Sequence, residues 1–276
     1  MRIATYNVQS LSGKAELVER LVQSTGLDII GLTETWMRPT DRFLLPMQYE
    51  AVTLDPPGRC NRGEGGIALA WKVGVKGIVR YRQRDRKVQI LVVKIAGCLI
   101  ALVYFSPSAR REEVENALTK LRQVCRGPTI ILGDLNARHN RWDRTTNRFG
   151  STILKWAEKY SWTIRAAQEP TFVSRTGRSN IDLFITKDLQ APLNPWIPHG
   201  DWDGMSDHNP VVLEITVPAP VRETGRRRVA WRKRTDPDCL QQSRDVALKE
   251  NPGLIAAIKA ANSITELNRV YMSGAK

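Results

Sequence analysis

The chain has 276 residues and 42% of them are hydrophobic, which is enough to bury the core of one large α/β domain. The sequence has no run of about 18 apolar residues, no apolar leader and no CxxC pair, so we expect an intracellular protein without a membrane span, a zinc site or a disulfide framework. The net charge of +14 favours a polyanion, above all a nucleic acid, as the partner.

The N-terminal part has the pattern of a β-α-β unit. Residues 2–9, "RIATYNVQ", alternate as in a strand, and residues 14–25 show helical apolar spacing that stops at Gly26. Residues 27–35, "LDIIGLTET", form a short apolar run typical of a buried strand. Further apolar strands, separated by turn residues, are predicted at 65–73, 86–97 and 98–107.

The second half alternates helices with strands up to residue 217. Amphipathic helices are predicted at 111–125 and 148–162. Buried strands are predicted at 128–136, 179–186 and 209–217. Because strands alternate with helices but also follow one another in hairpin-like groups, we expect a sheet-rich α/β fold with mixed pairing.

The composition changes after residue 217. Residues 222–234 hold seven basic residues against one acidic residue, which is typical of a linker or basic arm, and a short helical stretch follows. We therefore expect one domain at 1–217 and a basic linker with a short helical segment at 218–276.

Several predicted strands begin or end at a polar side chain. Taken singly, an Asn or Asp at a strand end is more often a turn residue, and a lone His is more often a surface residue. Taken together, the pattern predicts that these side chains converge on one edge of the fold and form a site. The residues are Asn7, Glu34, Tyr104, Asp134, Asn136, Asp182, Asp207 and His208.

The residue types indicate metal-assisted chemistry on a phosphate. Carboxylates such as Glu34 and Asp207, with the amide oxygen of Asn7, suit Mg²⁺ or Mn²⁺. His208 could contact a phosphate oxygen or move a proton, with Asp182 fixing its orientation. Asp134 and Asn136 could hold an attacking water. The chain has neither a GxxxxGK[ST] loop nor a GxSxG elbow, which argues against nucleotide-triphosphate hydrolysis and against an α/β-hydrolase.

The ordered motifs "TYN", "TET", "VYFSP", "GDLN", "SNID" and "SDH" resemble those of the endonuclease/exonuclease/phosphatase superfamily across roughly residues 1–216. Within it, "GDLNARHNRWD", "NRFGSTILKWAEKY", "PTF" and "SNIDLFI" look most like the endonuclease domain of non-LTR (LINE-type) retrotransposons. In those proteins the domain precedes a reverse transcriptase, and the basic tail with "VAWRK" looks like the start of that connection.

The resemblance implies a four-layer sandwich of two packed mixed β-sheets flanked by helices. It also implies a Mg²⁺- or Mn²⁺-dependent endonuclease that nicks double-stranded target DNA in the nucleus and leaves a 3′-hydroxyl for retrotransposition. Element RNA and a reverse transcriptase domain would be further partners. Asn7, Glu34 and Asp207 would hold the metal, and Tyr104 would touch the scissile phosphate. The remaining implied roles are water binding by Asp134 and Asn136 and charge stabilisation by His208, oriented by Asp182. Asn147 and Ser179 would contact DNA, and these two residues and Thr171 match the family less closely.

One position departs from the family pattern. Relatives that repair abasic sites carry an aspartate two residues after the first Asn, where this chain has Gln9. The missing charge argues against a dedicated repair enzyme, and the basic surface argues against a small-molecule phosphatase. Both stay as alternatives, together with an inactive remnant that only binds nucleic acid.

Two arginine-rich segments are candidate DNA contacts. Arg80, Arg82, Arg84 and Arg86 recur at period two, so in an extended strand all four would face one way. The alternative is an edge strand that charge protects from pairing. Arg138 and Arg141 precede Trp142, and Arg144 and Arg148 follow it, just after "GDLN". These arginines could grip backbone phosphates, although Trp142 could instead be part of the core.

Overall fold

A computed structural model of the chain describes residues 1–38, 40–41, 47–53, 65–175 and 177–216. The basic linker and helical segment expected at 218–276 lie outside these residues, so the boundary at 217 stays a prediction. Within the described ranges, no helix is long and apolar enough to cross a membrane.

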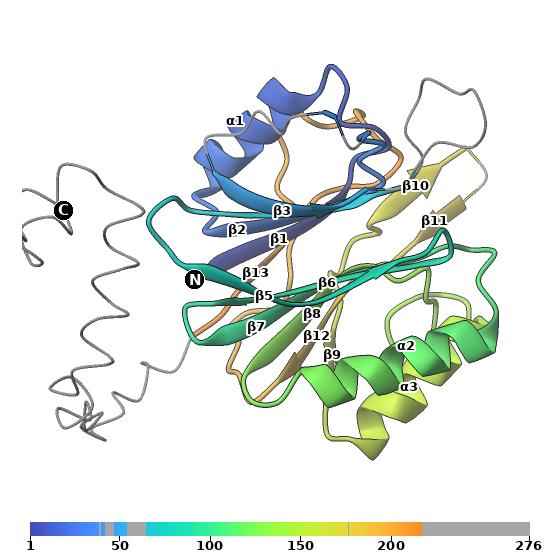
Figure 1. Cartoon of the computed structure of the whole chain (residues 1–276). Helices are drawn as coiled ribbons and strands as arrows, with labels where there is room; N and C mark the ends of the chain where they lie inside the picture. The colour runs from blue at the N-terminus through green and yellow to red at the C-terminus, as the bar shows by residue number, and fades with distance from the viewer. Residues whose placement is uncertain (39, 42–46, 54–64, 176, 217–276) are drawn as a thin grey trace, which may run out of the picture. The chain divides into compact units, whose positions relative to one another are not determined.

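Two mixed β-sheets form the centre of the domain (Figure 1). The five-stranded sheet has the order β13-β1-β2-β4-β3, with β1 and β2 parallel and the other pairs antiparallel. Its strands are β1 (Arg2–Asn7), β2 (Ile29–Thr33), β3 (Gln48–Val52), β4 (Ile67–Trp71) and β13 (Val211–Glu214).

The six-stranded sheet has the order β5-β6-β7-β8-β12-β9, and its only parallel pair is β7 with β8. Its strands are β5 (Gly77–Arg84), β6 (Val88–Ile95), β7 (Cys98–Phe105), β8 (Thr129–Asp134), β9 (Thr163–Arg165) and β12 (Asp182–Lys187). A separate two-stranded hairpin consists of β10 (Phe172–Ser174) and β11 (Gly177–Ser179).

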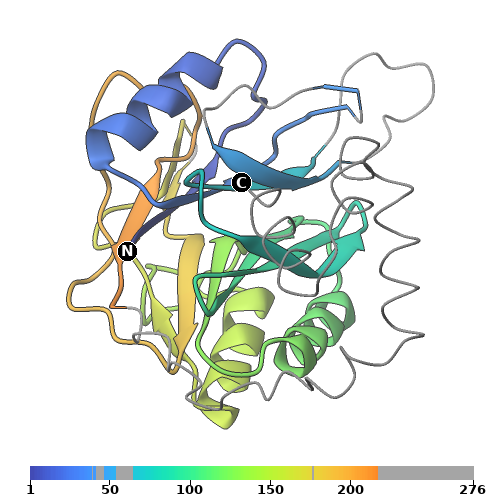
Figure 2. The ribbon, with the colours of Figure 1, turned by 60° about the vertical axis from the view of Figure 1, so that its left-hand side comes forward.

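Helices cover the outer faces of both sheets, and the inner faces pack on each other (Figures 1 and 2). Helix α1 (Ala15–Thr25) packs its apolar side on the five-stranded sheet and ends at Gly26, as its spacing predicts. Helices α2 (Arg111–Val124) and α3 (Arg148–Lys159) cover the six-stranded sheet. Fully buried aliphatic side chains fill the space between the sheets. The predicted four-layer sandwich is confirmed.

Gly133 lets the end of β8 pass very close to β7. Its φ of +140° is rare for residues with a side chain, and a Cβ atom there would overlap the carbonyl oxygen of Val103. A glycine is therefore required directly before Asp134, and it fixes where that carboxylate leaves the sheet.

Candidate active site

The polar ends of six strands meet at one edge of the sandwich. β1, β2, β7 and β8 end there, whereas β12 and β13 run antiparallel to their neighbours and begin there. We call this edge the rim. The side chains gathered there are Asn7, Glu34, Tyr104, Asp134, Asp182 and His208.

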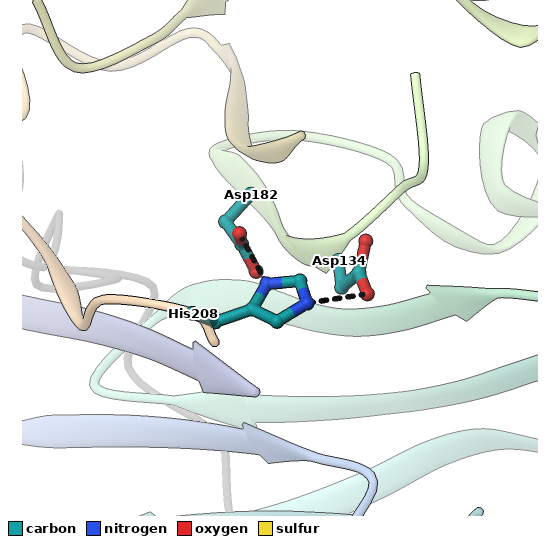
Figure 3. Close-up of side chains that lie close together, drawn as sticks. All are labelled: Asp134, Asp182 and His208. Atoms are coloured by element: carbon teal, nitrogen blue, oxygen red, sulfur yellow. Dashed lines mark hydrogen bonds and ion pairs between the residues drawn. The ribbon is translucent and has the colours of Figure 1, made fainter. Parts of the chain in front are cut away.

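His208 lies between two carboxylates (Figure 3). Its Nδ1 is 2.8 Å from Asp182 Oδ2, and its Nε2 is 3.9 Å from Asp134 Oδ2. All three side chains are almost fully buried. The hydroxyl of Thr171 donates to the same oxygen of Asp182 at 2.8 Å, so Asp182 is held while it orients the imidazole.

Burial and charge shift the acidity of this group of residues. Burial alone would lower the pKa of His208, but the carboxylate of Asp182 outweighs it and raises that pKa to about 9. Burial raises the pKa of Asp134 to about 7, although the nearby His208 opposes the shift. These shifts favour a protonated imidazole at His208, and they make the carboxyl group of Asp134 take up a proton more readily than an exposed aspartate does.

A second set of hydrogen bonds joins the two sheets across the rim. The amide nitrogen of Asn7 donates to Glu34 Oε1 and to Asp134 Oδ2, both at 3.0 Å. The hydroxyl of Tyr104 donates to the same Glu34 oxygen at 3.1 Å. Burial, reinforced by Glu34, raises the pKa of Tyr104 far above its ordinary value, so this hydroxyl stays a donor.

Asn136 and Asn147 build the loop that follows β8. Asn136 has a left-handed φ of +47°, donates its backbone N–H to Asp134 Oδ1 at 3.0 Å and uses its side-chain amide on the carbonyl oxygen of Phe105. Asn147 caps α3 by accepting from Gly150 N, and its amide nitrogen donates to the carbonyl oxygen of Asn136 at 2.8 Å. The loop therefore uses both side chains to fix its own backbone.

Asp207 is linked to the rim through Gln9. It is exposed, and its Oδ2 accepts from Gln9 Nε2 at 3.5 Å, while its backbone N–H donates to Gln9 Oε1 at 3.1 Å. Of the three expected metal ligands, Asn7 and Glu34 are in direct contact, and Asp207 contacts Gln9 instead.

The donor atoms at Glu34 suit an oxygen-preferring cation. Asn7 and Tyr104 both bond Oε1, and no donor of the described chain contacts Oε2. Asp134, Asp182 and His208 also offer ligand atoms within 4.8 Å of one another, but His208 Nδ1 is already bonded to Asp182. The chemistry of this donor set fits Mg²⁺ or Mn²⁺ at Glu34, and the three buried residues are suited to proton and charge handling.

The four arginines of the period-two segment do not share one face. A β-bulge between Val79 and Tyr81 takes Arg80 out of the ladder, and Arg86 lies beyond the end of β5. Arg82 pairs with Leu91 and Arg84 pairs with Gln89, and these partner side chains face the other sheet. The two arginines therefore lie on that face of β5, and Arg82 bonds Glu50 on β3. The prediction of a single four-arginine face is wrong, because one extra residue reverses the alternation.

The remaining candidate DNA contacts lie beside the rim. Arg138 is exposed, whereas Arg141 is exposed but paired with Glu158 on α3. Trp142 is half-buried against the core and donates its indole N–H to the carbonyl oxygen of Ala137. Ser179 is buried in β11, next to Thr171, so it offers little surface to a ligand.

Comparison with known proteins identifies the family. A model described as "Endonuclease/Exonuclease/phosphatase family" matches residues 4–208. The chain belongs to this family. The resemblance to retrotransposon endonuclease domains is confirmed by the matches below.

Two curated relatives are much longer than the matched region. The chain is 28% identical over 225 residues to "Probable RNA-directed DNA polymerase from transposon BS" and 24% identical over 195 residues to "RNA-directed DNA polymerase from mobile element jockey", both of Drosophila melanogaster. The alignments cover 78% and 67% of this chain but only 24% and 21% of the relatives. The chain therefore spans about a quarter or less of their length.

Solved structures share the fold. The endonuclease domain of TRAS1, a telomere-specific non-LTR retrotransposon, aligns with a TM-score of 0.58 and 20% identity, covering 78% of this chain and 97% of that domain. An AP endonuclease from Archaeoglobus fulgidus aligns with a TM-score of 0.57 and 16% identity, covering 79% of this chain and all of that one. At these identities the likeness concerns the fold.

Proposed function

We propose that this chain is a Mg²⁺- or Mn²⁺-dependent DNA endonuclease that nicks double-stranded target DNA in the nucleus for retrotransposition. The observation that carries the proposal is the buried Asp182–His208–Asp134 arrangement beside Glu34, on the sandwich of a nuclease and phosphatase family. The two curated relatives are named as RNA-directed DNA polymerases of mobile elements, and TRAS1 is named as a retrotransposon. A reverse transcriptase domain and element RNA are the further partners that these names suggest.

Five of the six rim residues have a direct role in the proposed hydrolysis. Asp134, with its raised pKa, accepts a proton from the attacking water, and the backbone N–H of Asn136 holds the carboxylate of Asp134 in place. Protonated His208, kept charged by Asp182, stabilises the negative charge that develops on the phosphate oxygens, and Tyr104 donates to the phosphate. A cation at Glu34 would supply Lewis-acid stabilisation of the same charge.

The bond changes determine the product ends. The oxygen of water forms a bond to phosphorus, its proton passes to Asp134, and the bond from phosphorus to the 3′ oxygen breaks. The 3′ oxygen takes a proton from solvent, so the products are a 3′-hydroxyl and a 5′-phosphate. Such an end can prime a polymerase directly, which a role in retrotransposition requires.

A plasmid assay tests the proposal. We expect supercoiled plasmid to become open circular with Mg²⁺ and to stay intact with chelator, since the carboxylate site needs a cation. The nicked product should support extension by a polymerase without phosphatase treatment. Cleavage that persists in chelator, or ends that carry a 3′-phosphate, would contradict the proposal. If a duplex with one abasic site is cut much faster than intact DNA, this result would instead favour a repair nuclease.

Arg82 and Arg84 give a second prediction, about the path of the DNA. Arg84 pairs with Gln89, and Gln89 pairs with Tyr104, so Arg84 lies on the same face of the sheet about 10 Å from Tyr104. If the duplex lies there, the variant Arg82→Ser/Arg84→Ser should bind all sequences more weakly. The slope of log affinity against log salt should become shallower by about one unit for each lost phosphate contact.

The control variant for this measurement is Arg111→Ser/Arg122→Ser on α2, which removes the same charge from the outer helix layer. Its salt slope should change less. Equal salt slopes for the two variants would mean that the DNA does not lie along Arg82 and Arg84. Nick positions should stay the same in both variants, because phosphate contacts do not specify sequence.

A further inference from the structure

The ammonium of Lys14 joins two loops of the rim that are far apart in the sequence. Nζ donates to the carbonyl oxygens of Val8 and Gln9, just after β1, at 2.7 and 3.1 Å. It also donates to the carbonyl oxygen of Met205 at 2.6 Å. Because an ammonium has three N–H donors, these bonds use all of them. Lys14 therefore crosslinks the loop after β1 to residues 205–208.

Gln9 extends this connection to the side chain of Asp207. Its amide exchanges two hydrogen bonds with Asp207, one from Nε2 to the carboxylate and one from the Asp207 backbone to Oε1. Gln9 itself has a left-handed φ of +44°, and its backbone N–H donates to Asn7 Oδ1 at 3.2 Å. The loop after β1 is therefore tied both to Asn7 and to Asp207.

Ser206 forms a third bridge between the same loops. Its hydroxyl donates to the carbonyl oxygen of Asn7 at 2.7 Å and accepts from the backbone N–H of His208 at 3.1 Å. Residues 201–207 belong to no strand or helix, although the carbonyl oxygen of Asp207 accepts from the backbone N–H of Val173 at 2.7 Å. The side-chain bridges add a connection from this segment, just before His208, to the loop after β1.

We propose that Lys14 and Gln9 are positioning residues for Asp207 and His208. Neither touches the buried group of Asp134, Asp182 and His208, so both act through the loop at 205–208. The inference rests on the proposed function, because the positioned groups matter for catalysis only if the rim hydrolyses a phosphodiester. A shift of about 1 Å in such a group can lower a rate by up to about a hundredfold.

Lys14→Met and Gln9→Met test the inference in the full chain. Methionine has a similar length but cannot donate, so each change removes hydrogen bonds with little change in volume. We expect the nicking kcat to fall about tenfold or more while KM changes by less than about twofold. Lys14→Arg should restore part of the rate, since it keeps the charge and the donors. The matched control is Lys72→Met, because Lys72 bonds Asp28 away from the rim.

A second readout needs neither DNA nor a cation. The Nδ1–H proton of His208, bonded to Asp182, should give a strongly downfield proton NMR signal, assigned by its loss in His208→Gln. In Lys14→Met and Gln9→Met this signal should shift or broaden through faster exchange, while the melting temperature stays near that of the wild type. Lys72→Met should leave it unchanged.

The outcomes separate the inference from the proposed function. A wild-type signal and a wild-type kcat in folded Lys14→Met and Gln9→Met would overturn the inference. If Lys14→Met does not fold, Gln9→Met decides, because it removes only the two bonds to Asp207. If the wild type does not nick DNA, the proposed function fails, and the NMR comparison alone still decides whether Lys14 and Gln9 position His208.

Discussion

Replacing Asp134 with asparagine should lower the nicking rate by about a thousandfold, since it removes a buried proton acceptor that the reaction requires. The carboxylate lies at the end of β8, bonded by Asn7 and by the backbone of Asn136, and its Oδ2 faces His208. Asparagine has nearly the same shape, so we expect the fold to persist. The measurement is the rate of plasmid nicking under saturating Mg²⁺, with Asp85→Asn as the control, because Asp85 is an exposed carboxylate in the turn after β5.

The pH dependence of the wild-type protein and of Asp134→Asn provides a further check on the role of Asp134. Asp134 must be ionised to accept a proton, and burial raises its pKa to about 7, so wild-type activity should fall as the pH drops below about 7. The folded protein favours the neutral form of the Asp134 carboxyl group. Asp134 therefore stabilises the fold fully below its ordinary pKa of 3.8, and this stabilisation is lost as the pH rises through about 7. Asp134→Asn should therefore melt higher than the wild type at pH 8. A folded variant that nicks at the wild-type rate would refute the role of Asp134.

Strong apolar runs allow most of the fold to be predicted from the sequence. Runs such as "TIILGD" and "CLIALVYF" are buried on both faces, which leaves a continuous apolar signal. The strands that were not predicted lack that signal. β3 (Gln48–Val52) is mostly half-exposed, and β9, β10 and β11 have three residues each. β3 and β9 form because the sheet beside them is already in place, whereas β10 and β11 form a separate hairpin.

Asn147 shows that a local sequence pattern can indicate a helix cap. It stands three residues before Gly150 at the start of an amphipathic run, which is the pattern of a helix N-cap. The motif resemblance favoured a DNA contact for this residue, whereas its side chain caps α3 and supports Asn136. The local sequence pattern at Asn147 therefore indicates a helix cap.

The connections between distant loops were not predictable from one sequence. Lys14 and Met205 are 191 positions apart, and their contact depends on how β1 and β13 pair. The partner of Asp207 depends likewise on the conformation of the turn at Gln9, where φ is positive. The residue types at strand ends predict which groups gather at the rim, but loop conformation decides which of them touch.

The second large effect concerns His208 and Asp182 together. We expect His208→Ala to lower the nicking rate about a thousandfold, and Asp182→Asn about a hundredfold or more, since each removes the charged, oriented imidazole. Asp182 raises the pKa of His208 to about 9, so the wild type should lose activity as pH rises through about 9. In Asp182→Asn this loss should occur at lower pH, because the neutral amide no longer stabilises the imidazolium.

The two losses should not add in a double-mutant cycle. We assume that Asp182 acts by orienting His208 and keeping it protonated. Once His208 is absent, the change Asp182→Asn should lower the nicking rate little further, so the double variant should resemble His208→Ala. The matched control is the exposed histidine His199, which lies 3.4 Å from Asp203, and the variant His199→Ala should leave the rate unchanged. Fully multiplicative effects of Asp182→Asn and His208→Ala in folded proteins would mean that the two residues act independently, and the buried hydrogen bond between them would then serve the fold and not the reaction.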